Sequence, residues 1–130
     1  MKKTLARRRR GFTLIELLIV LAIVGTLLTI AVPSYFASMD NAKEASLKQS
    51  LSVMRTAIDH YKGDLGKYPE TLQELVTAKY LRSMPVDPIT GAPDQWTTEM
   101  AAEPGQTPGV RDVHSGAPGN GKDGTPYASW

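Results

Sequence analysis

The chain has 130 residues, enough for one modest domain with a short appendage, and its 42 % of hydrophobic residues is ordinary for a folded protein. It has no cysteine, which excludes disulfides, thiolate nucleophiles and cysteine-ligated zinc. The formal net charge of +2 is unevenly distributed, because six of the 15 basic residues lie in the first ten positions. The remainder is mildly acidic, which argues against nucleic-acid binding.

An apolar segment follows the basic one. Residues 12–32 read FTLIELLIVLAIVGTLLTIAV and carry one charged side chain, Glu16. About 20 apolar residues in a helix span the hydrocarbon core of a bilayer, and the upstream cations favour a cytoplasmic N-terminus. The sequence therefore predicts one membrane-spanning helix with a cytoplasmic N-terminus, with the rest of the chain on the far side of the inner membrane.

Three interpretations of this segment compete. A secretory signal peptide would be cut after the apolar run, but residues 29–31 (TIA) make only a weak cleavage site. A plain signal anchor accounts for the charge and the length but leaves Glu16 unexplained. In a prepilin-like leader the chain is cut between Gly11 and Phe12, and the apolar helix remains as the anchor and assembly element.

The carboxylate of Glu16 favours the third interpretation. A carboxylate in the membrane costs about 2.5–3.5 kcal/mol on insertion scales, so such a residue usually has a partner. Cleavage would free the amine of Phe12, and a neighbouring subunit could offer that cation at membrane depth. A single chain cannot make the pair well if four residues of helix separate the two groups. The alternative is a glutamate that snorkels to the cytoplasmic interface.

The residues GFTLIE at positions 11–16 resemble the cleavage and methylation motif of type IV prepilins and type II secretion pseudopilins. The resemblance implies that Gly11 is the last leader residue, recognised by prepilin peptidase. It also implies that Phe12 becomes the N-methylated first residue of the mature chain and that Glu16 is the assembly carboxylate. The predicted organisation is then a leader over residues 1–11, a membrane and assembly segment over 12–33 and a periplasmic domain over 34–130.

The helix-breaking glycine and proline of that family match Gly25 and Pro33. Pro33 has no N–H, so the carbonyl of Thr29 lacks its helical partner. Gly25 lowers helix propensity by about 1 kcal/mol relative to alanine. We expect residues 25–33 to be a weak part of the helix that can unwind in a filament. A simple proline kink near the membrane surface is the alternative.

An amphipathic pattern follows Pro33. Apolar residues recur at spacings of four, three, four and three, which places them on one face of a helix. The long helix is predicted to run from about Thr13 to Tyr61 and to end near Gly63, and a short helix is predicted over residues 70–79. The residues of the apolar stripe are Leu47, Leu51, Met54, Ile58 and Tyr61.

The last third of the chain is rich in proline and glycine. Residues 85–130 contain seven of each, so helices are not expected there. Short strands are predicted at Gln95–Met100 and Val110–His114, with a last one near Trp130. The predicted fold class is α+β and pilin-like: one long helix with an apolar first half and an amphipathic second half, a short helix, and a small antiparallel sheet with a Gly/Pro-rich C-terminal loop.

The segments GKYP at 66–69, YLRSMPVDP at 80–88 and DVHSG at 112–116 resemble the major pseudopilin family of type II secretion, general secretion pathway protein G. The resemblance implies a structural subunit that polymerises through its N-terminal helix into a pseudopilus and drives export of folded proteins across the outer membrane. The alternatives are a type IV pilin for adhesion, twitching or DNA uptake, and a plain membrane-anchored binding module.

The partners that the resemblance implies are other copies of the chain, prepilin peptidase, minor pseudopilins, and an inner-membrane assembly platform with its ATPase. Membrane lipid is a further partner. The chain lacks the motifs G-x-S-x-G and H-E-x-x-H and a phosphate-binding glycine loop, so no enzymatic function is predicted.

The resemblance also implies a calcium site in the C-terminal loop. Asp112, Ser115 and Asp123 are the candidate ligands, although Pro118 stands where the family has an aspartate. Calcium takes six to eight oxygen ligands, several of them from carboxylates, and this stretch offers only two carboxylates. The alternative is that Asp112 and Asp123 make local hydrogen bonds in turns. No other cofactor is predicted.

Overall fold

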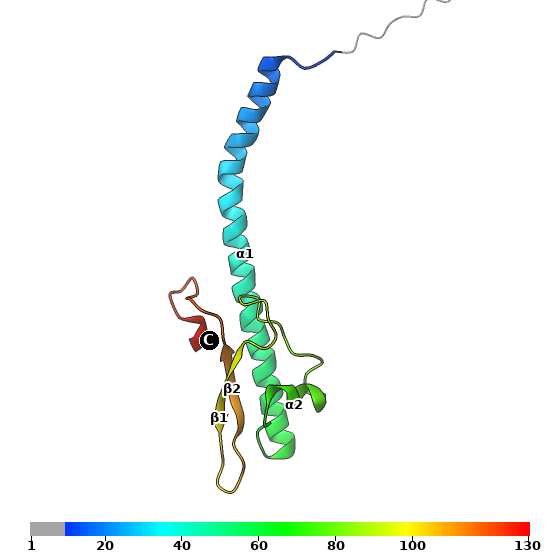
Figure 1. Ribbon diagram of the computed structural model, residues 1–130, viewed down its shortest axis with the longest axis vertical. Coiled ribbons are helices and arrows are strands. Elements are labelled where there is room, and N and C mark those ends of the chain that lie inside the picture. Colours follow the sequence, from blue (N-terminus) through cyan, green and yellow to red (C-terminus); the bar gives the residue numbers. More distant parts are fainter. Residues whose placement is uncertain (1–9) are drawn as a thin grey trace, which may run out of the picture. The chain divides into compact units, whose positions relative to one another are not determined.

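The computed structural model describes residues 10–130, which fall into two units. One comprises the described residues up to Met39, and the other is Asp40–Trp130. The α+β, pilin-like fold class is confirmed, with a long N-terminal helix, a short helix and a two-stranded antiparallel sheet (Figure 1). The elements are α1 (Leu14–Leu65), α2 (Leu72–Thr77), β1 (Trp96–Ala101), β2 (Gly109–Ser115) and the 3-10 helix η1 (Tyr127–Ser129).

Helix α1 extends slightly further than the sequence predicts. It continues through Gly63 and ends at Leu65. The next residue, Gly66, has a φ of +70°, and its N–H donates to the carbonyl of Lys62 at 2.9 Å. A glycine in this left-handed conformation is the usual way to end a helix. Gly66 therefore ends α1, and Gly63 is accommodated inside it.

The first half of α1 has an apolar surface that the described residues leave uncovered. An 18-residue window within α1 has a mean hydropathy of 2.7, and none of it is buried. In the part of the chain that the structure describes, α1 is the one helix long and apolar enough to cross a membrane. This surface fits a membrane-anchored protein.

The core of the second unit is built on the amphipathic half of α1. The predicted apolar stripe is confirmed, because each of its residues is at most 2 % exposed. The stripe packs against Leu75 of α2 and against Val110 and Val113 of β2. Figure 1 shows the β1–β2 hairpin and α2 beside this half of α1. A small domain thus obtains its core by sharing one face of a long helix.

Strands β1 and β2 pair antiparallel, close to the ranges predicted from the sequence. Trp96 lies opposite Ser115 and Glu99 lies opposite Asp112, and a bulge follows between Glu99 and Met100. In β2 the side chains alternate, so Val113 and Ser115 are buried while Asp112 and His114 are half-buried. The alternation places the chemically active side chains Asp112 and His114 on a common face of the strand.

Two predicted elements need correction. The strand predicted near Trp130 is wrong, because residues 127–129 form η1, in which the N–H and hydroxyl of Ser129 both bond to the carbonyl of Pro126. The short helix is also shorter than predicted. Thr71 caps its N-terminus by accepting from the N–H of Glu74, and the chain leaves the helical conformation by Lys79, whose φ is 65°.

Candidate functional site

The N-terminal motif forms a capping box at the start of α1. The hydroxyl of Thr13 accepts from the N–H of Glu16 at 3.2 Å, and a carboxylate oxygen of Glu16 accepts from the N–H of Thr13 at 3.3 Å. The sequence T-x-x-E at a helix start is the signature of this reciprocal arrangement. A negative charge in the first turn is also stabilised by the helix dipole. Glu16 therefore has a partner inside its own chain.

This geometry corrects one premise of the sequence analysis. Helix α1 begins only at Leu14, so Phe12 precedes the helix and is not separated from Glu16 by a full turn of it. Arg10, Gly11, Phe12 and Glu16 line one small open pocket. Of the predicted leader over residues 1–11, only Arg10 and Gly11 are described, and the remaining leader residues lie outside the described part of the chain.

Gly25 and Pro33 lie inside a continuous helix. Ser/Thr hydroxyls in this region bond back to backbone carbonyls: Thr29 Oγ1 donates to the carbonyl of Thr26 at 2.6 Å, and Ser34 Oγ donates to that of Ile30 at 3.2 Å. Pro33 supplies no N–H to the carbonyl of Thr29. Unwinding of residues 25–33 in a filament stays a prediction.

Arg55 organises a second region, at the C-terminal end of the chain. Its guanidinium donates to a carboxylate oxygen of Asp112, to the carbonyl of Val113 and to the backbone oxygen of Trp130, each at 2.8 Å. One side chain of α1 thus fastens β2 and the C-terminal segment. In the helical pattern Arg55 falls outside the apolar stripe, among the polar residues of the helix.

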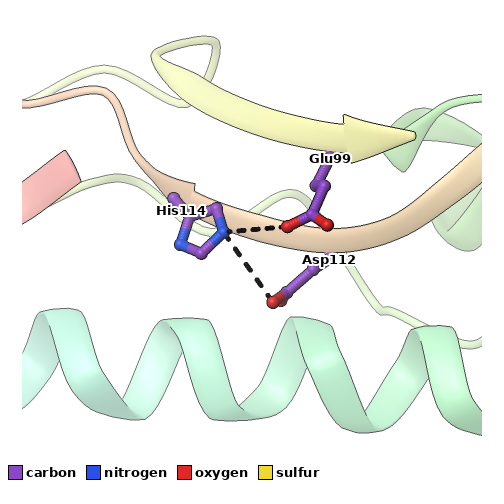
Figure 2. Close-up of side chains that lie close together, drawn as sticks. All are labelled: Glu99, Asp112 and His114. Atoms are coloured by element: carbon purple, nitrogen blue, oxygen red, sulfur yellow. Dashed lines mark ion pairs between the residues drawn. The ribbon is translucent and has the colours of Figure 1, made fainter. Parts of the chain in front are cut away.

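The charge of Asp112 is stabilised by these contacts. Partial burial is the largest single influence and raises the pKa of Asp112, but hydrogen bonds from the N–H of Val113 and from Arg55 outweigh it and leave the pKa below its usual range. Nε2 of His114 lies 3.7 Å from Asp112 Oδ2 and 3.7 Å from Glu99 Oε2 (Figure 2). Glu99 is a member of this cluster that the sequence analysis missed.

The predicted calcium ligands are brought together only in part. Asp112 and Asp123 line one open groove, together with Lys48 and Arg55. The hydroxyl of Ser115 is fully buried and points elsewhere.

Each of the three already has hydrogen-bond partners within the chain. Ser115 Oγ donates to Asp87 Oδ2 at 2.6 Å, and Asp123 Oδ1 accepts from the N–H and hydroxyl of Thr125, which lowers the pKa of Asp123. Calcium needs several converging oxygens, and the cations Lys48 and Arg55 share the groove with Asp112 and Asp123. As arranged, Asp112, Ser115 and Asp123 do not fit one calcium ion.

Comparison with known proteins gives two consecutive matches. The family model "Prokaryotic N-terminal methylation motif" matches residues 6–32, and the model "Type II secretion system (T2SS), protein G" matches residues 34–129. The second match covers well over half of the chain. The chain belongs to the type II secretion system protein G family.

Curated relatives agree with this family. The type II secretion system core protein G of Pseudomonas aeruginosa is 36 % identical, over 91 % of this chain and 89 % of the relative. The protein of the same name from Klebsiella pneumoniae is 32 % identical, over 95 % of this chain and 91 % of the relative. No solved structure gives a significant match.

One relative represents the alternative function. A type IV major pilin protein of Myxococcus xanthus is 37 % identical, but the match covers only 52 % of this chain and 31 % of that protein. Its coverage is much lower than that of the protein G relatives. The family therefore rests on matches over most of the chain, which include the C-terminal domain.

Proposed function

We propose that this chain is a structural subunit of a type II secretion pseudopilus. In this proposal the subunits polymerise through the N-terminal half of α1, and the growing filament drives export of folded proteins across the outer membrane. The observation that carries the proposal is the uncovered apolar surface of α1 directly behind a prepilin-type motif in a protein G family chain. Lipid would cover this surface before assembly, and neighbouring subunits would cover it afterwards.

Processing would precede assembly. Prepilin peptidase would cut between Gly11 and Phe12, removing residues 1–11, and would methylate the new amine of Phe12. Access is supported by the exposure of Gly11 and Phe12, which both precede the helix. Residues 12–33 would remain in the inner membrane, and residues 34–130 would lie in the periplasm.

Glu16 would then exchange partners. In the single chain its carboxylate accepts from the N–H of Thr13. In the filament the carboxylate would meet the positively charged amine of a neighbour's Phe12, a stronger partner than a neutral N–H. An assembly platform with its ATPase would extract the subunit from the membrane, and minor pseudopilins would be further partners.

A clean deletion with two parallel assays tests this function. We expect loss of specific exported proteins from the culture medium, with surface pili and twitching unchanged, and recovery on complementation with the wild-type chain. Loss of pili with normal export would contradict the proposal and favour a type IV pilin, the function of the Myxococcus xanthus relative.

Complementation with a Gly11→Leu chain tests the processing step. The bulky side chain at the cleavage position should leave a longer precursor that retains residues 1–11 and does not restore export. Mass spectrometry of the purified chain measures both the cut and the methyl group. A normally cut Gly11→Leu chain would contradict the assignment of the leader.

A further inference from the structure

Three side chains of metal-ligating types converge on one face of the β1–β2 hairpin. Glu99 of β1 lies opposite Asp112 of β2, and His114 follows two residues later on the same face. Each offers one ligand atom, and these atoms all lie within 4.8 Å of one another (Figure 2). The cluster lies in the second unit, apart from the N-terminal processing motif, and includes only one of the residues predicted to bind calcium.

The spacing within the cluster is too long for direct hydrogen bonds. Nε2 of His114 is 3.7 Å from one oxygen of Glu99 and 3.7 Å from one oxygen of Asp112. Charge-assisted hydrogen bonds between nitrogen and carboxylate oxygen measure about 2.7–2.9 Å. Tetrahedral zinc with bonds of about 2.0–2.2 Å to nitrogen and oxygen holds its ligand atoms about 3.4 Å apart. The two distances from Nε2 are closer to the separation of ligand atoms around a shared ion than to the length of such a hydrogen bond.

A hydrogen bond at Nδ1 of His114 sets the orientation of the other ring nitrogen, Nε2. Nδ1 lies 2.6 Å from the backbone oxygen of Trp130, which can only accept a hydrogen bond. Nδ1 therefore carries a proton, while Nε2 faces the two carboxylates. The lone pair of Nε2 is repelled by the two negative groups unless a cation, either a proton or a metal ion, lies between them. Metal-binding histidines usually donate their other ring N–H in this way.

Each of the two carboxylates is likewise held through its second oxygen, the one that does not face His114. Oδ1 of Asp112 accepts from Arg55 and from the N–H of Val113, each at 2.8 Å, and Oε1 of Glu99 pairs with Arg111. The oxygen that faces His114 is the other one in each case. Because the arginines offset part of the carboxylate charge, and one ligand is an imidazole, the cluster suits a borderline transition metal better than calcium.

We propose that Glu99, Asp112 and His114 bind one divalent transition-metal ion of the zinc class. Water would occupy the remaining coordination position on the open side, where Glu99 is 45 % exposed. The ion would join β1 to β2 and, through the bond between His114 and Trp130, would hold the C-terminal segment against the hairpin. The proposal concerns this domain alone and is independent of filament assembly.

Zinc titration of the full chain in detergent, after removal of metals with a chelator, tests the proposal. A fluorescent zinc indicator would compete for the ion. We expect one zinc per wild-type chain and at least a tenfold loss of affinity in His114→Gln, since even residues behind the ligands typically contribute 10- to 100-fold. Glu99→Gln should lose affinity as well, and it replaces a more exposed side chain with one of similar shape.

His60→Gln is the matched control, because His60 is the other histidine of the chain and lies exposed on α1. It should bind zinc like the wild type. Zinc should raise the unfolding temperature of the wild type and of His60→Gln, but not that of His114→Gln. Equal affinities in all four chains, or the same loss in His60→Gln as in His114→Gln, would overturn the proposal. So would a wild-type chain that fails to compete with the indicator.

Discussion

The two units of this protein differ in whether their apolar side chains are buried or exposed. In residues 40–130 the apolar stripe of α1 is buried against α2 and β2. In residues 12–36 the large apolar side chains are all exposed, from 45 % at Val32 to 87 % at Phe12. The first arrangement stabilises a single chain in water. The second leaves apolar surface open to other molecules. In the proposed function, lipid and then neighbouring subunits cover this surface.

Substitution of Glu16 should have the largest effect on assembly, because it removes the one charged side chain of residues 12–36. Glu16→Ala should insert in the membrane and fail to assemble. Glu16→Gln separates the two roles of this residue, since glutamine also serves in a capping box but carries no charge. If assembly needs the charge, both variants fail, and recovery of filaments by Glu16→Gln would indicate that capping is sufficient.

Sheared filament yield, measured against membrane-inserted subunit, is the readout for both variants. Asp94→Ala is the matched control, because it removes an exposed carboxylate from a loop of the second unit. We expect it to assemble like the wild type. A comparable loss of filaments in Asp94→Ala would argue against a specific role of Glu16.

In residues 40–130, replacing a side chain of the apolar stripe with a smaller one should destabilise the domain without affecting membrane insertion. Ile58 is fully buried, and Ile58→Ala should cost about 2–5 kcal/mol. Val53, on the same helix, is 41 % exposed, and Val53→Ala should cost about 0.5 kcal/mol or less. Unfolding in detergent, followed by tryptophan fluorescence, measures both. Similar losses would mean that Ile58 is not in the core.

A substitution at Gly116 tests a close backbone contact at the end of β2. A Cβ at this position would clash with the carbonyl oxygen of Gln95, which is backbone and cannot rotate away. Gly116→Ala should therefore cost about 1–3 kcal/mol through overpacking. Gly63→Ala is the control, because nothing lies within 4 Å of its Cβ position and alanine is favoured inside a helix by about 1 kcal/mol. A stable Gly116→Ala chain would contradict the contact.

The smallest expected effect concerns Tyr61, whose hydroxyl donates to Glu74 at 2.5 Å. This hydrogen bond, together with burial, raises the pKa of Tyr61 to about 12. The folded state therefore favours the protonated phenol. The stability that this gives is complete below about pH 10, the unfolded value, and is lost as the pH rises toward 12.

Tyr61→Phe should cost about 1.5 kcal/mol at neutral pH, near the low end for hydrogen bonds to charged groups. The variant should also lose less stability than the wild type between pH 10 and 12. Hydrogen bonding to Asp64 raises the pKa of Tyr80, and burial followed by hydrogen bonding to Glu44 raises that of Tyr127, so the measurement is the difference from the wild type. An unchanged alkaline profile in Tyr61→Phe would contradict this account.

The sequence predicts the parts of the structure that depend on local patterns. The apolar stripe of α1 and both strands follow from periodicity, and the membrane segment follows from length and charge. The capping box is also readable from the sequence as T-x-x-E, a signal that the interpretation of Glu16 as an assembly carboxylate did not use. The short η1 replaces a predicted strand because Pro126 and Ser129 close a local turn.

Contacts that join distant segments could not be predicted in the same way. Arg55 meets Asp112 across 57 positions of sequence, and Ser115 meets Asp87 across 28. Nothing in the local pattern around Arg55 distinguishes it from other polar residues of the helix. The convergence of Glu99 with Asp112 depends on the strand register, which the sequence left open. Long-range register and side-chain direction are therefore what the structure adds.

A cryo-electron microscopy map of filaments assembled from the processed chain tests the central claim most directly. The account predicts that the exposed half of α1 lies in the centre of the filament and that the carboxylate of Glu16 lies within ion-pair distance of a neighbour's Phe12 amine. A filament in which Glu16 still bonds to its own Thr13, with no neighbouring amine in reach, would contradict it.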